Sequence, residues 1–312
     1  MRRKVLVITG LRRSGTTALW QCFRGIENTA AFDEPFHPAL ATGPRENPKG
    51  TWTELSEFLD AGGIDPVAIA PEAEVHSRPS EGEKVYFGEL SRAAEQIVFD
   101  TVRAWNRIPD LYPDPQQTLT IHLLRDPCGW ITGHLLPTGK KTWRKSISDP
   151  YRWFTYFSRT DFYNNYHYEA IIDKALAIDA PLWKAVAMST RELSRAPAYI
   201  KLLAFWWCTN LATYQALKEQ EVPRIMITLQ EFSAAPDQQI QRLLNAAGWE
   251  DVMPDLSHVK SVRASHGSTH PAWKSAARNL GVPSELLVSG GATSAALEVA
   301  FHAATQEGRR AR

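Results

Sequence analysis

Residues 5–17 read Val-Leu-Val-Ile-Thr-Gly-Leu-Arg-Arg-Ser-Gly-Thr-Thr, and this stretch decides the fold. An apolar, β-branched run ends in a loop bounded by Gly10 and Gly15, and the apolar residues 18–23 that follow predict a helix. Such a strand–loop–helix unit turns successive backbone N–H groups toward one small cavity, where they can bind an anion. We therefore expect an α/β protein with an anion site at the end of its first strand.

The loop differs from a nucleoside-triphosphate loop at one position. That loop reads G-x-x-x-x-G-K-[ST], in which the lysine contacts the terminal phosphates and the hydroxyl binds magnesium. Here Thr16 occupies the lysine position, and the cations stand upstream at Arg12 and Arg13. A cation just before a helix N-terminus is unfavourable unless an anion lies between them. The loop therefore predicts an anion site that works without magnesium.

The composition bounds the size of the protein and the class of partner. A chain of 312 residues with 44% hydrophobic and 22% charged content suits one large α/β domain, spanning residues 1–312. The net charge of +1 argues against a nucleic-acid partner, so the anion should be small. Cys22, Cys128 and Cys208 fit neither a disulfide framework nor zinc spacing. Because no apolar window is long enough for a bilayer, we expect a cytoplasmic protein with no membrane partner.

Apolar patterns along the chain alternate between strands and helices. We predict further strands at residues 29–32, 85–90, 118–124 and 224–229, and helices at residues 51–59, 93–105, 182–193, 199–217 and 238–247. The polar segment 71–83 predicts a surface loop. Ligands of parallel sheets bind beyond the carboxyl ends of the strands. That edge should bring together four side chains from separate segments: Arg12, Glu34, Glu89 and Arg125.

Several aromatic residues have two interpretations. The aromatic-rich segment at about residues 138–168 has no regular period, and it could line an acceptor pocket or fill the core. Trp20 and Trp130 could stack on a nucleobase, although tryptophans on a helix beside a sheet usually belong to the core. His122 lies inside a predicted strand, which favours a core histidine.

Four segments carry motifs in a fixed order. They are Arg-Ser-Gly-Thr-Thr at 13–17, Phe-Asp-Glu-Pro-Phe-His at 32–37, Leu-Thr-Ile-His-Leu-Leu-Arg-Asp-Pro at 119–127, and the strand and helix end at 227–232 and 243–249. Together they resemble the sulfotransferase superfamily that uses 3′-phosphoadenosine 5′-phosphosulfate (PAPS). The first resembles its 5′-phosphosulfate loop, the second the F-E-P segment of its carbohydrate branch, the third its 3′-phosphate site and the fourth its late strand–helix unit.

The resemblance implies a fold and a reaction. The fold would be a P-loop-like three-layer sandwich with a central parallel sheet flanked by helices. The reaction would be in-line transfer of a sulfuryl group from PAPS to a hydroxyl of a carbohydrate or small natural product, releasing 3′,5′-ADP without a metal. Two rivals stay open: a phosphotransferase that uses ATP and magnesium, against which Thr16 argues, and a non-catalytic nucleotide-binding module. The acceptor and the oligomeric state are left open.

The resemblance also implies roles for named residues. Nucleotide binding is expected from the loop and from the turn after the fourth strand: Arg12, Arg13, Ser14, Gly15, Thr16, Thr17, Arg125, Thr132 and Gly133. Arg13 should stabilise charge on the leaving phosphate rather than donate a proton, because a guanidinium does not readily lose one. Arg125 should bind the 3′-phosphate, the alternative being an ion pair with Asp126.

An acceptor hydroxyl must lose its proton as it attacks, so the site needs a base. Glu34 is the first candidate and Glu89 the second, followed by Asp33 and His37. The simpler interpretation of Glu34 is a carboxylate that pairs with Arg12 or Arg13.

The chain departs from the family pattern in three places. Many members have a lysine at the end of the third predicted strand, where this chain reads Gly-Glu-Leu-Ser-Arg at 88–92. Gly133 stands where a serine is usual, so Thr132 or a backbone N–H should supply that contact. The basic R-K-G tail of the aryl-type enzymes is absent, and its rough substitutes are Lys260, Arg263, Ser265 and Ser268. Sulfuryl transfer needs no bridging magnesium, which would explain why the chain has lost both the loop lysine and a Walker-type acidic strand end.

Overall fold

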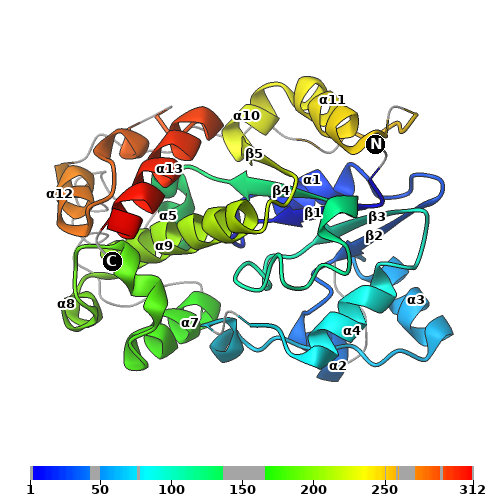
Figure 1. Cartoon of the computed structure of the whole chain (residues 1–312), viewed down its shortest axis with the longest axis horizontal. Helices are drawn as coiled ribbons and strands as arrows, with labels where there is room; N and C mark the ends of the chain where they lie inside the picture. The colour runs from blue at the N-terminus through cyan, green and yellow to red at the C-terminus, as the bar shows by residue number, and fades with distance from the viewer. Residues whose placement is uncertain are drawn as a thin grey trace, which may run out of the picture. The chain divides into compact units, whose positions relative to one another are not determined.

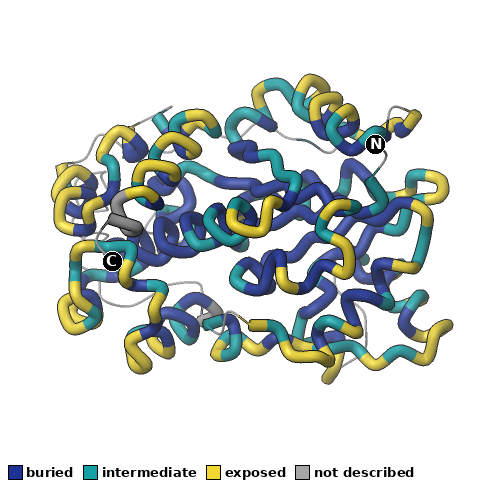
Figure 2. The backbone as a smooth tube through the Cα atoms, in the orientation of Figure 1, coloured by how far each residue is buried: buried dark blue, intermediate teal, exposed yellow. Residues whose placement is uncertain are grey.

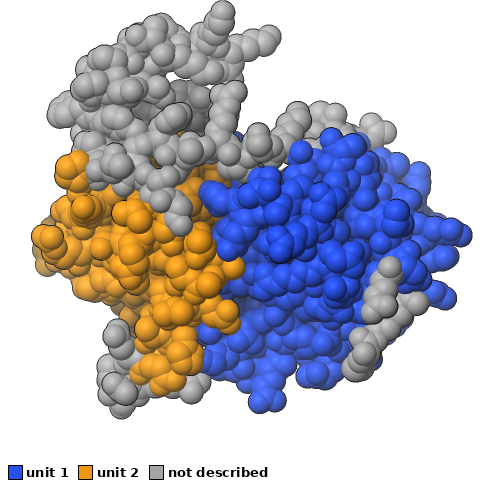
Figure 3. Space-filling model, turned by 90° about the horizontal axis from the view of Figure 1, so that it is seen from above, with its two compact units in different colours: residues 1–124, 213–262 blue, residues 125–212, 263–312 orange. Residues whose placement is uncertain are grey.

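The computed structural model describes residues 3–42, 50–75, 78–135, 166–249, 251–257, 259, 271–288 and 291–310. Contacts between Cα atoms divide the chain into two compact units (Figure 3). Unit 1 comprises Met1–Leu124 and Thr213–Val262, and unit 2 comprises Arg125–Ala212 and Arg263–Arg312. The expectation of a single domain over residues 1–312 stays a prediction.

Unit 1 is built on a parallel sheet, which has five strands within the described residues (Figure 1). The strands are β1 (Val5–Thr9), β2 (Thr29–Asp33), β3 (Gln96–Asp100), β4 (Thr118–Leu124) and β5 (Arg224–Thr228), in the spatial order β2-β3-β1-β4-β5. In the register of the sheet, Asp33 pairs with Asp100. Because every pairing is parallel, the carboxyl ends of all these strands lie at one edge of the sheet.

Helices cover both faces of this sheet. On one face, Val5 and Val7 belong to an apolar cluster that includes residues of α3 (Thr53–Gly62) and α4 (Glu81–Leu90). On the other, the alternate residues Leu6 and Ile8 join residues of α1 (Thr16–Gln21), α10 (Leu229–Ala234) and α11 (Pro236–Ala247). Figure 2 shows the strands as a buried centre. Burial on both faces explains why the strands are nearly continuous apolar runs, and it confirms the α/β class.

The other elements are helical. Unit 1 also contains α2 (Pro38–Thr42) and the short 3₁₀ helices η1 (Pro71–Val75) and η2 (Pro115–Gln117). The remaining helices are α5 (Pro127–Leu135), α7 (Tyr166–Ala177), η4 (Pro181–Ala185), α8 (Thr190–Arg195), α9 (Ala198–Glu219), α12 (Pro271–Leu280), η5 (Ser284–Leu287) and α13 (Ser294–Arg310). Among the helices of the described part of the chain, none has the length and apolar character that crossing a membrane requires.

The structure confirms most of the expected elements and corrects two. The strands predicted at 29–32, 118–124 and 224–229 are present within one residue of their expected ends. The strand predicted at 85–90 is wrong, because these residues belong to α4. A capping box starts that helix: Ser80 Oγ accepts a hydrogen bond from Glu83 N, and the Glu83 carboxylate accepts one from Ser80 N. The helix predicted at 93–105 is also wrong, since it contains β3.

Candidate functional site

The candidate site lies at the carboxyl edge of the sheet in unit 1. Three neighbouring strands end there in polar residues, β1 at Thr9, β2 at Asp33 and β3 at Asp100. The segments that leave these strands carry the predicted anion-binding loop, Glu34 and Arg103. This is the edge at which parallel sheets bind ligands.

The loop between β1 and α1 needs its two glycines. A Cβ atom at Gly10 would clash with the backbone oxygen of Leu123, and one at Gly15 would clash with the side chain of Leu229. Gly15 also has a left-handed φ of 95°, and Arg13 has one of 67°, which is rare for a residue with a side chain. No side chain of the described residues caps α1, whose first-turn N–H groups have no partner within a helix.

The side chains of the loop differ in how far they are exposed to solvent. Ser14 and Thr16 are buried, Arg12 is half-buried and Arg13 is exposed. Thr17 Oγ1 donates a hydrogen bond to Asp100 Oδ2 at 3.3 Å, which ties the start of α1 to the end of β3. The predicted loop residues therefore share one segment, and their nucleotide-binding role stays a prediction.

Asp33 and Asp100 form a buried pair of acids beneath the loop. They occupy paired positions on neighbouring strands, and Thr51 Oγ1 donates a hydrogen bond to Asp33 Oδ2. Burial, together with the charges of Asp33 and Glu34, holds the pKa of Asp100 well above its usual value. The surroundings of Asp100 therefore favour its protonated form. Asp100 also corrects the expectation that no acidic residue ends a strand beside the loop.

Glu34 follows β2 and has a partner that the sequence did not indicate. Its N–H donates to the carbonyl oxygen of Asp100 at 3.0 Å, and its own φ of 42° is left-handed. Its Oε2 accepts a hydrogen bond from Arg103 Nε at 3.2 Å. His37 Nε2 lies 4.0 Å from the same oxygen, while His37 Nδ1 accepts from Ala39 N. A non-glycine residue held in this conformation at a strand end is a common feature of functional sites.

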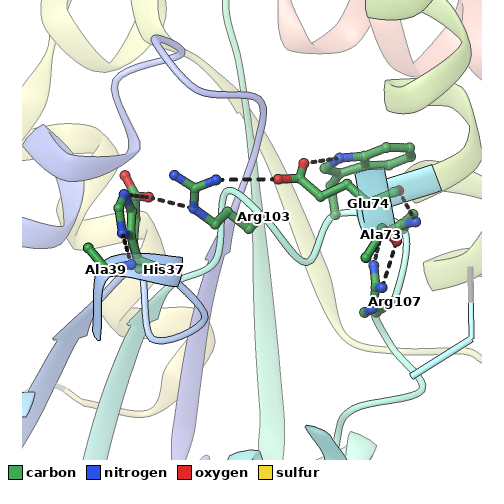
Figure 4. A network of polar contacts seen from close by, with 9 residues as sticks. His37, Ala39, Ala73, Glu74, Arg103 and Arg107 are labelled. Carbon is green, nitrogen blue, oxygen red and sulfur yellow. Dashed lines mark hydrogen bonds and ion pairs between the residues drawn. The ribbon is translucent and has the colours of Figure 1, made fainter. Parts of the chain in front are cut away.

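Arg103 links Glu34 to a second acid, Glu74 of η1. Its Nη1 lies 3.5 Å from Glu74 Oε1, and Trp105 Nε1 donates to Glu74 Oε2 at 3.3 Å. Figure 4 shows Arg103 between Glu74 on one side and the His37 segment on the other. Burial raises the pKa of Glu74 to about 8, although Arg103, Trp105 and Arg12 all favour the ionised form. The prediction of a surface loop over 71–83 is therefore wrong at Glu74, which is fully buried.

A second buried arginine fixes the segment that carries Glu74. Arg107 donates through Nη2 to the Ala73 carbonyl at 2.8 Å and through Nε to Glu83 Oε2 at 3.2 Å. The side chain of Asn106 donates to the backbone oxygen of Glu74 and accepts from Arg107 Nη1 (Figure 4). These bonds attach η1 to the segment after β3.

Glu89, the second candidate base, lies elsewhere. It is near the end of α4, from which residues 91–95 lead to the start of β3, so it belongs to the opposite edge of the sheet. Its Oε1 is 2.6 Å from Arg92 Nη1, and both side chains are exposed. The structure therefore corrects the expectation that Glu89 joins the site.

The predicted 3′-phosphate residues belong to unit 2. Arg125 directly follows β4, and Thr132 and Gly133 lie in α5. A side chain at Gly133 would lie 3.7 Å from Arg125 Nη1, which is where the usual serine would stand. Thr132 Oγ1 donates to the carbonyl of Cys128 at 2.8 Å, within its own helix. Asp126 Oδ1 accepts from Gly129 N at 2.6 Å at the start of α5.

The aromatic predictions have mixed outcomes. Trp20, Trp130 and His122 are buried, which supports their interpretation as core residues. Tyr168 packs edge-on against Trp130, with ring centroids 5.2 Å apart. Most of the aromatic segment at 138–168 lies outside the described residues, as do the tail positions Lys260, Arg263, Ser265 and Ser268.

Within the described ranges, no group of three or more His, Cys, Asp or Glu side chains is arranged to hold a metal ion. Comparison of the chain with protein-family models and with curated proteins finds no match.

Proposed function

We propose that the chain is a sulfotransferase that moves a sulfuryl group from PAPS to an acceptor hydroxyl. The observation that carries this proposal is that Asp100 anchors both halves of the site. Its side chain accepts from Thr17 of the loop, and its backbone carbonyl accepts from the N–H of Glu34. The predicted anion-binding loop and Glu34 are thus both attached to Asp100, which lies between them.

The proposed reaction is a single in-line displacement. The acceptor O–H gives its proton to the Glu34 carboxylate as its oxygen forms a bond to sulfur. The bond from sulfur to the bridging oxygen of the 5′-phosphate breaks, and negative charge accumulates on the phosphate. Arg13 and the loop N–H groups would stabilise that charge, and 3′,5′-ADP would leave. The parallel sheet and the position of the loop after its central strand support a P-loop-like fold for this site.

A second candidate is a phosphotransferase that uses ATP and magnesium. The hydrogen bond from Thr17 to Asp100 favours it, because these are the hydroxyl and the acidic strand end that a magnesium-dependent loop uses. Two features oppose it: Thr16 replaces the lysine, and the pKa of Asp100 is raised, which favours the protonated form of this acid. A protonated carboxyl is a poor magnesium ligand.

Calorimetric titration of the purified chain with 3′,5′-ADP, with ATP, and with ATP plus magnesium separates these candidates. We expect 3′,5′-ADP to bind without magnesium, and incubation with PAPS and a panel of hydroxyl compounds to release 3′,5′-ADP. A magnesium-dependent ATP response that Asp100→Asn abolishes, with no response to 3′,5′-ADP, would establish the second candidate instead. Binding of 3′,5′-ADP without turnover on any acceptor would point to the non-catalytic module.

A further inference from the structure

We propose that Arg103 is a positioning residue for the Glu34 base, and that Glu74 determines how much of the Arg103 charge acts on Glu34. The inference rests on the proposed function, because the base role of Glu34 is what gives Arg103 this task. It adds two residues, Arg103 and Glu74, that no sequence motif indicated.

The geometry shows one cation between two acids. Arg103 Nε is 3.2 Å from Glu34 Oε2, and Arg103 Nη1 is 3.5 Å from Glu74 Oε1. The Arg103 side chain is 5% exposed, Glu74 is 0% exposed and Glu34 is 17% exposed. Of these three side chains, Glu34 is therefore the one that an acceptor can reach. The guanidinium stays charged and presents its N–H donors in a fixed fork, so Arg103 holds the Glu34 carboxylate in one orientation beside a positive charge.

Arg103 is held by the backbone around it. Thr101 donates through both N and Oγ1 to the carbonyl of Ile8 in β1, and Ala104 N donates to the carbonyl of Thr101. Thr213 Oγ1 donates to the carbonyl of Trp105. The guanidinium thus projects from a segment fixed on both sides, as a preorganised site requires.

Glu74 is the group that can withdraw the charge of Arg103 from Glu34. Once Glu74 loses its proton, it becomes a second carboxylate that competes with Glu34 for the charge of Arg103. The pKa of Glu74, raised by burial to about 8, places this change just above neutral pH. Ionised Glu74 would also weaken anion binding at the loop, since it interacts electrostatically with Arg12.

Other charged groups face the same network. His37, Asp33 and Asp100 lie around Glu34, and Arg107 and Trp105 contact the η1 segment or Glu74 itself. His37 titrates near neutral pH when unperturbed, so its contribution has to be measured separately.

The test uses pH profiles of kcat/KM from pH 5.5 to 9.5 for wild type, Arg103→Met, Arg103→Lys and Glu74→Gln, repeated in a His37→Gln background. Arg92→Met is the matched control, because it breaks an arginine–glutamate contact on the exposed surface of α4. Titration with 3′,5′-ADP and circular dichroism show whether each variant folds and binds the nucleotide.

We expect Arg103→Met to shift the acidic limb of the kcat/KM profile toward higher pH by about one unit and to lower kcat about tenfold. Arg103→Lys should return the limb toward its wild-type position while kcat stays low, because lysine restores charge but not the fixed fork. Wild type should lose affinity for 3′,5′-ADP above about pH 8, and Glu74→Gln should remove this loss. Arg92→Met should follow the wild-type profile.

An acidic limb in Arg103→Met at the wild-type pH, with kcat equal to that of Arg92→Met, overturns the inference while leaving the sulfotransferase intact. A wild-type chain that neither binds 3′,5′-ADP nor transfers sulfuryl overturns the proposed function and this inference together. If Arg103→Met does not fold, Arg103→Lys with wild-type kcat overturns the inference by itself.

Discussion

Replacing Glu74 by glutamine should change how stability depends on pH. Burial raises the pKa of Glu74 to about 8 in the folded chain, against 4.5 for an unperturbed glutamate. Between these values the folded chain binds more protons than the unfolded chain, so the free energy of unfolding falls as the pH rises. The contribution of protonated Glu74 to the free energy of unfolding is thus fully present below about pH 4.5 and is lost progressively up to about pH 8.

The size of the effect follows from the two pKa values. With about 1.4 kcal/mol for each unit of pKa, wild type should lose about 2.5 kcal/mol between pH 5 and pH 7 through this one group. Glutamine cannot ionise, and its oxygen can still accept the hydrogen bond from Trp105. The free energy of unfolding of Glu74→Gln, minus that of wild type, should therefore rise by about 2.5 kcal/mol over this range and level off above about pH 8.

Urea denaturation followed by far-ultraviolet circular dichroism at pH 5, 6, 7 and 8 measures this difference. Glu81→Gln is the control, because Glu81 is an exposed residue of α4 that pairs with Lys84, and its difference from wild type should stay nearly constant. A constant difference for Glu74→Gln, or one that falls as the pH rises, would refute the reasoning. Glu74 would then be ionised at pH 7 and paired with Arg103.

Three further predictions concern the proposed reaction. Glu34→Gln should lower turnover at least about a hundredfold, because glutamine cannot accept the proton, while calorimetry should find the affinity for 3′,5′-ADP within about threefold of wild type. Unchanged turnover would exclude Glu34 as the base. Arg125→Ala should weaken 3′,5′-ADP binding about tenfold or more but leave binding of 5′-AMP nearly unchanged. Equal losses for the two nucleotides would contradict a 3′-phosphate contact. Gly15→Ala should lower the free energy of unfolding by about 1–2 kcal/mol, since an alanine there is strained and meets Leu229; a melting temperature equal to that of wild type would contradict this.

The sequence was informative where one segment carries the whole signal. The run Val5–Thr9 and the two glycines after it define strand, loop and helix without help from the rest of the chain. The strands β2, β4 and β5 could be predicted for the same reason. The sequence did not predict the five-residue strand β3. The β-branched and aromatic residues Val85–Phe87, earlier in the chain, predicted a strand there instead, because their β propensity outweighed the capping signal at Ser80.

Because β3 was not predicted, two residues of the candidate site, Asp100 and Arg103, were not predicted either. These two residues join the site because β3 lies between β1 and β2. This position places Asp100 beside Thr17 and Arg103 beside Glu34. Strand order is a property of the whole sheet, so no local pattern contains it. Glu74 was missed for a different reason: a polar, proline-containing segment is normally exposed, and here buried arginines hold it down.

The buried acid pair, Asp33 and Asp100, makes occupation of the loop a proton-coupled event. An anion bound against Thr16 and Thr17 would add negative charge beside two buried carboxyl groups, of which Asp100 already has a raised pKa. By linkage, the added charge raises the pKa of Asp100 further, so the complex should take up hydrogen ions from the buffer rather than release them. The heat of binding should therefore vary with the ionisation enthalpy of the buffer, so the acids below the loop report on its occupancy.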